Sequence, residues 1–285
     1  MNSLKSGTCP RNLKSKLRTG LNFPSGMILV IFISALILTG IFYQPFDYNE
    51  MNSQNRFMAP GFPHLMGTDN FGRDVFSRIM AGGRHTLLTA LLTVAGSAAA
   101  GMILGMLAGF IGGVWDEITM RLMDALSSFP GIILALIMVT LLDTGALVTA
   151  LLILFIPSYT RIMRSGTLQY RNRDFVLAAR ITGVSRIRIL LVHILPNLFP
   201  SLLSASVLGL SNAILAESTM SYLGLGIQPP EPSWGRMLAE SQTFIHNAPW
   251  AALSPGLMIM LTVLAFHYLG ESLGQRNFGS PDSLE

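Results

Sequence analysis

Residues 170–197 read YRNRDFVLAARITGVSRIRILLVHILPN and decide the fold of this chain. The stretch lies between strongly apolar segments, yet it carries five arginines and a single acid, Asp174. Because arginine side chains are costly to bury in lipid, the stretch must form a loop on one face of a membrane. With Arg161 and Arg164 just before it, it holds seven of the nineteen lysines and arginines. Such loops face the cytoplasm, so we expect a cytoplasmic loop over residues 164–197.

The composition agrees with a membrane protein. Of the 285 residues, 51% are hydrophobic and only 12% are charged, which is unlike an ordinary soluble domain. The net charge of +4 does not indicate nucleic-acid binding, because the basic residues fall in patches between apolar runs. We therefore expect an all-α, polytopic protein that contacts membrane lipid and no nucleic acid.

The apolar runs predict six transmembrane helices with both termini in the cytoplasm. Residues 1–23 form a basic tail, residues 24–44 the first transmembrane helix, and residues 45–85 an extracytoplasmic segment. Residues 86–272 hold the other five spans, and residues 273–285 form a second cytoplasmic tail. This topology places 14 of the 19 lysines and arginines inside, as the positive-inside rule requires.

The basic loop itself reads as two short helices joined at a glycine. Gly183 can take the positive φ of a helix C-terminus, and Ser185 can cap a second helix that Pro196 ends. Ala178 and Ala179 leave a low surface that the backbone of another protein could approach closely.

A second motif lies in the extracytoplasmic segment, where residues 67–87 read GTDNFGRDVFSRIMAGGRHTL. The pattern predicts a turn followed by an amphipathic helix, in which Asp69 or Asp74 pairs with Arg73 or Arg78. In the next span, four small residues recur at steps of four and predict close packing against another helix. They are Ser97, Gly101, Gly105 and Gly109.

Three further segments complete the outline. Residues 112–124 read as a short inside turn, which leads through Phe129-Pro130 into a third span that ends near Asp143. Residues 221–238 read SYLGLGIQPPEPSWGRML, too rich in Gly and Pro for a regular helix, and we expect an ordered outer loop. Glu217 lies near the outer end of the fifth span, where we favour a structural or gating role over a substrate contact.

These motifs resemble those of the permease subunits of binding-protein-dependent ABC importers. Ala178-Ala179, Gly183 and Leu195-Pro196 resemble the EAA loop that docks into the ATPase, with Leu177 at the position of the usual Glu. The 67–87 segment matches GTDxxGRDxxSRxxxGxR, which marks the dipeptide, oligopeptide and nickel branch of the family.

The resemblance implies a function and a set of partners. It implies a pore-forming subunit with the five-helix core of type I importers, in the inner membrane of a prokaryote. Its partners would be a homologous second permease, two ABC ATPases that bind ATP and magnesium, and an extracytoplasmic solute-binding protein. The site residues fall into two implied groups. They are the coupling residues Ala178, Ala179, Gly183, Leu195 and Pro196, and the outer motif Gly67, Thr68, Asp69, Gly72, Arg73 and Asp74.

The chain itself shows no pattern for catalysis, a metal or a bound cofactor. All three lysines precede the first span, which excludes a Walker A motif. The G-x-S-x-G match at residues 270–274 follows an apolar span and has no histidine after it, so we regard it as chance. The histidines contain no i, i+4 pair for zinc.

Two alternatives stay open. A self-sufficient secondary transporter or channel is a different class, but it typically needs ionisable residues at mid-membrane, and these spans are nearly free of them. For the cargo we favour a di- or oligopeptide, with nickel or a metal chelate second. A bare nickel ion calls for several imidazole ligands, and no histidine lies at the centre of a span.

Overall fold

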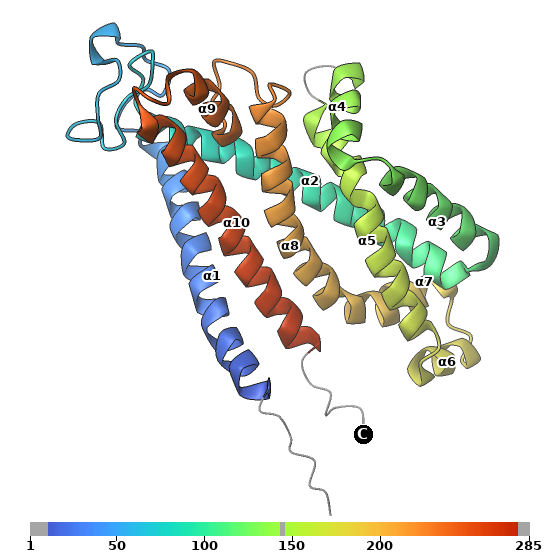
Figure 1. Ribbon diagram of the computed structural model, residues 1–285. Coiled ribbons are helices and arrows are strands. Elements are labelled where there is room, and N and C mark those ends of the chain that lie inside the picture. Colours follow the sequence, from blue (N-terminus) through green and yellow to red (C-terminus); the bar gives the residue numbers. More distant parts are fainter. Residues whose placement is uncertain (1–10, 143–145, 279–285) are drawn as a thin grey trace, which may run out of the picture.

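The computed structural model describes residues 11–142 and 146–278, and over these residues the chain is helical without a strand (Figure 1). The helices are α1 Arg11–Phe42, α2 Val75–Ile111, α3 Gly113–Ser128, α4 Gly131–Leu142, α5 Leu147–Arg171, α6 Asp174–Ile181, α7 Arg186–Arg188, α8 Leu195–Tyr222, α9 Trp234–Ser241 and α10 Pro249–Phe278. A π-helix, Ile189–Ile194, joins α7 to α8. Two 3₁₀ turns, Ser53–Asn55 and Gln242–Phe244, lie in loops. The all-α prediction is confirmed.

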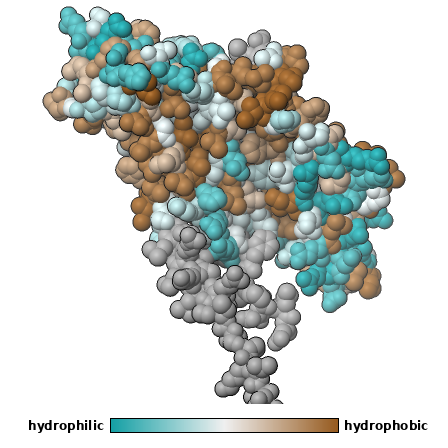
Figure 2. Space-filling view, in the orientation of Figure 1, coloured by the Kyte–Doolittle hydropathy of each residue, from teal (hydrophilic) through white to brown (hydrophobic). Residues whose placement is uncertain are grey.

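In the part of the chain that the structure describes, five helical segments are long and apolar enough to cross a membrane. They are Phe23–Phe42, Val75–Ile111, Leu147–Arg171, Arg186–Tyr222 and Pro249–Gln275. The pair α3 and α4 makes a sixth span only if its two helices, bent by 92°, count as one. Hydrophilic residues gather over the segment between α1 and α2 at one end and over α3, α6 and α7 at the other, and hydrophobic residues cover much of the surface between them (Figure 2). The membrane-spanning architecture is therefore confirmed at five to six spans.

Close packing of α2 against α5 forms the centre of the fold, and the predicted small-residue face makes this contact. A Cβ on Gly101 would lie 2.4 Å from the Cβ of Tyr159, and one on Gly105 would lie 2.4 Å from the carbonyl oxygen of Thr160. Ser97 donates a hydrogen bond to the carbonyl of Leu152 across the same interface, at 3.1 Å. The small residues thus let the two backbones approach, as predicted.

Helices α1, α10 and α8 pack side by side next to this pair (Figure 1). A Cβ on Gly26 of α1 would lie 2.9 Å from the backbone nitrogen of Leu269 in α10, so these two helices also meet closely. The first span begins within one residue of its predicted start. Within the predicted N-terminal tail, α1 already begins at Arg11, and residues 1–10 lie outside the described residues.

The predicted short turn over residues 112–124 is wrong, because this segment forms the 16-residue helix α3. The chain turns at Gly112, which has a φ of 73° between α2 and α3, and again at Phe129, whose extended φ of −85° and ψ of 140° suit a residue before proline. The predicted third span is correspondingly short. Helix α4 has 12 residues and a length of about 18 Å, less than the ~30 Å of a bilayer core, and Asp143 lies outside the described residues.

Two other boundaries differ from the prediction. Pro196 does not end a helix but lies in the first turn of α8, where its missing N–H costs no hydrogen bond. The Leu195 N–H donates to the carbonyl of Leu190, the five-residue step of the π-helix. The predicted 221–238 loop contains the start of α9, because the Ser233 hydroxyl accepts a hydrogen bond from the Arg236 N–H at 3.3 Å and caps a helix there.

Candidate functional site

The outer motif forms a compact turn held by Asp69. One carboxylate oxygen of Asp69 accepts hydrogen bonds from the backbone N–H groups of Phe71, at 2.8 Å, and Arg73, at 3.0 Å. The other oxygen accepts from Nε of Arg73 at 2.6 Å. The Asp69–Arg73 pair was among the predicted alternatives and is present, and both side chains are buried.

Around this turn lies an ionic cluster of buried and half-buried side chains, which we call the outer ionic cluster: Asp69, Arg73, Arg78, Arg236 and Glu240. Glu240 of α9 accepts hydrogen bonds from Nη2 of Arg73 at 3.1 Å, from Nη2 of Arg78 at 3.5 Å and from Nε of Arg236 at 3.2 Å. Arg78 is only 2% exposed and lies 4.0 Å from Asp69. Glu240 was missed because it lies far along the chain, beyond the segment read as a loop.

The second carboxylate of the motif, Asp74, starts helix α2. It accepts hydrogen bonds from the N–H of Ser77 at 2.8 Å and from its hydroxyl at 2.7 Å, as an N-cap residue does. Its other oxygen lies 2.9 Å from Nδ1 of His64. Asp74 therefore pairs with a histidine rather than with the arginines that the sequence suggested. Thr68 ties the preceding loop to this turn, because its hydroxyl accepts from the N–H of Met58 at 2.8 Å.

The glycines of the motif are required by both conformation and space. Gly67 has a φ of 71° and Gly72 a φ of 76°, which favour glycine. A Cβ on Gly72 would lie 1.8 Å from the carbonyl oxygen of Asn52, and one on Gly67 would lie 2.5 Å from that of Met58. All six predicted motif residues thus meet in one folded turn at the start of α2.

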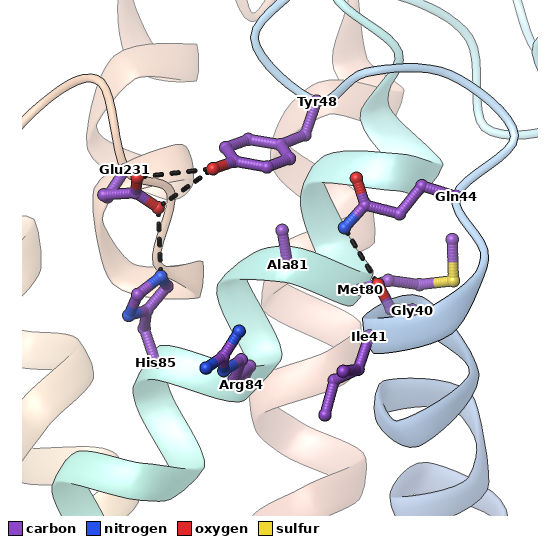
Figure 3. Close-up of a pocket in the computed structure, with 9 residues that line it drawn as sticks. All are labelled: Gly40, Ile41, Gln44, Tyr48, Met80, Ala81, Arg84, His85 and Glu231. Atoms are coloured by element: carbon purple, nitrogen blue, oxygen red, sulfur yellow. Dashed lines mark hydrogen bonds and ion pairs between the residues drawn. The ribbon is translucent and has the colours of Figure 1, made fainter.

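A cavity of about 270 Å³ lies beside this turn, between the end of α1 and the first turns of α2 (Figure 3). Glu231 points into it and accepts a hydrogen bond from the hydroxyl of Tyr48 at 3.3 Å, while Nε2 of His85 lies 3.1 Å from the same carboxylate. Burial, followed by the nearby Glu231 charge, raises the pKa of Tyr48 above its ordinary value of 10.0. Arg84 lines the same cavity. The structure adds this group of side chains to the residues found from the sequence.

At the opposite end of the molecule, α6 presents an exposed surface that differs in part from the predicted one. Ala178 is exposed, as are Leu177 at 41% and Ile181 at 86%. Ala179, however, is only 7% exposed and packs in the core with Val176. The expectation that both alanines form one open surface is therefore wrong, because the face of α6 that carries Val176 and Ala179 packs against the core.

Gly183 ends α6 as predicted. It has a φ of 79°, its N–H donates to the Arg180 carbonyl at 3.1 Å, and a Cβ there would meet no atom within 4 Å. A side chain at this position would therefore be strained by the backbone alone. The last two predicted coupling residues lie at the start of α8, where Leu195 is half-buried against the core and Pro196 is exposed.

Two ion pairs fasten α3 to α5 above this loop, and sequence reasoning did not foresee them. Arg164 donates two hydrogen bonds to the carboxylate of Asp116, one of them at 2.7 Å. Arg161 donates to Asp124 at 2.9 Å. The two arginines are three residues apart and therefore lie on one face of α5. Of the seven basic residues first assigned to the loop, two thus serve to hold helices together.

Glu217 lies inside the molecule and not on its surface. Its carboxyl group is fully buried, accepts a hydrogen bond from the Ser221 hydroxyl at 2.6 Å and lies 3.4 Å from that of Ser218. Among the described residues, no Lys, Arg or His forms an ion pair with it. Its position favours a structural role near the C-terminal end of α8.

The fold and these sites define a class: a multi-span helical membrane protein with an ordered segment at one end and an exposed helical loop at the other. Residues 101–278 match the family model described as binding-protein-dependent transport system inner membrane component. The match covers more than half of the chain, and the protein belongs to this family. It is a non-catalytic, multi-pass permease component of the inner membrane.

Characterised relatives cover most of the chain. It is 39% identical over 250 residues to the dipeptide transport system permease protein of Alkalihalophilus pseudofirmus, which covers 86% of this chain and 82% of the relative. It is 34% identical over 256 residues to the dipeptide permease protein of Haemophilus influenzae, covering 87% of both chains. It is 38% identical to the glutathione transport system permease protein of Escherichia coli, covering 87% of this chain and 84% of the relative.

Family membership settles the functional class. A component of a binding-protein-dependent system works with a solute-binding protein and with ATPase partners that bind ATP. The alternative of a self-sufficient secondary transporter or channel therefore does not hold. The membership does not by itself define the cargo.

Proposed function

We propose that this chain is a pore-forming subunit of an ATP-driven importer of di- or oligopeptides. The observation that carries the proposal is the 34–39% identity to dipeptide permeases over 86–87% of the chain. The glutathione permease belongs to the same set of relatives, and glutathione is itself a tripeptide. The relatives reported above therefore share small peptides as the chemical class of their cargo.

The cargo is tested by uptake. Labelled dipeptide, glutathione and radioactive nickel are offered to cells with and without the gene. We expect loss of peptide or glutathione uptake with nickel uptake unchanged. Loss of nickel uptake alone would contradict the peptide proposal while leaving the family assignment intact.

We propose that the α6 end faces the cytoplasm and the outer ionic cluster faces the other side, with both termini inside. The support is the split of 14 basic residues against 5, together with the family resemblance. Reporter fusions after residues 60, 115, 180 and 235 should read out, in, in and out. A cytoplasmic signal at residue 60 would refute this topology.

We propose that the exposed surface of α6 docks into an ATPase, and that the full assembly holds a second, homologous permease and two ATPases. Ala178→Glu places a charged side chain on this surface and should reduce both ATPase co-purification and uptake at normal membrane levels of the chain. Ala178→Ser is the matched control, because it adds only one oxygen. Normal ATPase co-purification with Ala178→Glu would contradict docking through this face.

For the outer motif we propose a structural role. Asp69, Arg73 and Asp74 are buried and make their hydrogen bonds within the chain, so few of their polar atoms are free to contact a solute-binding protein. Asp74→Ala should lower the stability of the chain by about 1 kcal/mol, because it removes the N-cap of α2. Unchanged stability with a loss of binding-protein association would point to a direct contact instead.

A further inference from the structure

A second cavity, of about 510 Å³, lies where the end of α2 meets α6 and α7. Three arginines from three different elements line it: Arg171 at the end of α5, Arg180 on α6 and Arg186 on α7. No acidic side chain lines it. The described cavity wall thus carries a formal charge of +3.

Two of the three arginines are fixed by contacts inside the chain. Nη1 of Arg171 donates a hydrogen bond to the carbonyl of Gly109 at 3.1 Å, and Cζ of Arg180 lies 5.2 Å from the ring centroid of Phe110. These contacts leave most of the guanidinium N–H donors available. The nearby acid Asp116 is bound to Arg164 through both carboxylate oxygens and does not line the cavity, although its charge also acts on Arg171.

An apolar track leads along α2 to this cavity. Ile103, Leu107 and Ile111 follow one another at steps of four on one face of the helix, and they are 56%, 44% and 52% exposed. Ile111 itself lines the cavity. Since α2 is a membrane span, this face is suited to an acyl chain that ends at the level of the arginines.

We propose that the cavity binds the phosphate group of an anionic phospholipid, whose acyl chain lies along Ile103, Leu107 and Ile111. Guanidinium groups bind phosphate oxygens through paired hydrogen bonds, and basic pockets between membrane helices suit lipid headgroups. An acidic side chain of the ATPase would offer the same kind of charge. The apolar track favours the lipid, because binding of a carboxylate from a soluble protein would not require exposed apolar residues along a membrane span.

The test is lipid retention by the transporter co-purified with its partner subunits in neutral detergent. The complex is incubated with equal amounts of phosphatidylglycerol and phosphatidylcholine and washed, and bound lipid is extracted and measured by mass spectrometry. We expect the wild type to retain phosphatidylglycerol preferentially. Each arginine removed by Arg180→Gln or Arg186→Gln should lower this retention about fivefold.

Two sets of variants make the test specific. The double variant Arg173→Gln and Arg188→Gln removes the same charge from the same loop outside the cavity, and should retain phosphatidylglycerol like the wild type. The charge-preserving double variant Arg180→Lys and Arg186→Lys should keep at least half of the retention, which separates loss of charge from misfolding.

Four results would overturn the proposal. The first is unchanged retention in the Arg180→Gln and Arg186→Gln double variant. The second is an equal loss in the control pair, which would mean a diffuse surface charge. The third is displacement by inorganic phosphate as complete as by added phosphatidylglycerol, which would assign the cavity to free phosphate. The fourth is loss of the ATPase from the variant complex with lipid retained, which would assign it to an acidic group of the partner.

Discussion

Replacing Gly105 with alanine should push α2 and α5 apart. The new Cβ would lie 2.4 Å from the carbonyl oxygen of Thr160 and 2.9 Å from the backbone nitrogen of Arg164. Both are backbone atoms, so no rotamer change can relieve the contact. Ordinary van der Waals contact begins at 3.4 Å, so α5 has to retreat by about 1 Å along its packed length. Overpacking of this kind costs about 1–3 kcal/mol.

Gly256→Ala in α10 is the matched control. Its Cβ would meet only the side chain of Leu238, at an ordinary 3.7 Å. The gain in helix propensity from Gly to Ala is about 1 kcal/mol and is common to both variants. The difference between them therefore isolates the steric cost of separating α2 and α5.

The measurement is unfolding of the purified chain in detergent, followed by circular dichroism. We expect Gly105→Ala to be about 1–3 kcal/mol less stable than Gly256→Ala. Peptide uptake should fall as well, because α5 leads directly into α6. Equal stability of the two variants would refute the inference that small residues are needed for this contact.

Two further predictions concern the outer segment. Asp69→Asn should destabilise the chain by about 3 kcal/mol, because it removes a charge from a buried cluster and leaves Arg73 and Arg78 with Glu240 alone. The control is Glu117, which forms an exposed ion pair with Arg121. Glu117→Gln should change the stability of the chain by less than about 1 kcal/mol. An equal loss of stability in the Asp69 and Glu117 variants would contradict the reasoning. The tyrosinate absorbance of the wild type minus that of Tyr48→Phe should titrate above pH 10.0, because the folded state raises the pKa of Tyr48. The stability that this raised pKa contributes is present below pH 10.0 and is lost as the pH rises through the pKa of Tyr48 in the folded state. Titration of Tyr48 below pH 10.0 would contradict the prediction.

Features that depend on local chemistry were predictable from the sequence. The spacing of Gly101 and Gly105 predicted close packing against another helix, which the structure identifies as α5, and the positive φ of Gly183 followed from its position after a helix-compatible segment. The pairing of Asp69 with Arg73 was one of the alternatives that the sequence offered. In each case the residues involved are close in sequence, or the feature depends on the small size or backbone freedom of a single residue.

Features that depend on contacts distant in sequence were not predictable. Glu240 joins Arg73 across 167 positions, and Asp116 joins Arg164 across 48. Nothing in the local pattern marks these acids as partners. The burial of Ala179 depends on which face of α6 meets the core, and the apolar residues of this eight-residue helix lie on all sides of it and do not define that face.

Helix α2 joins the two ends of the molecule without a break. Its first turn is capped by Asp74 within the outer turn, and the carbonyl of Gly109 near its other end is held by Arg171. Its 37 residues span about 55 Å, well beyond the ~30 Å of a bilayer core. Such a helix can act as a lever with its pivot at the capped end. A tilt of about 10° there would carry the α6 end sideways by roughly 10 Å, so a small rotation on one side of the membrane becomes a large displacement on the other.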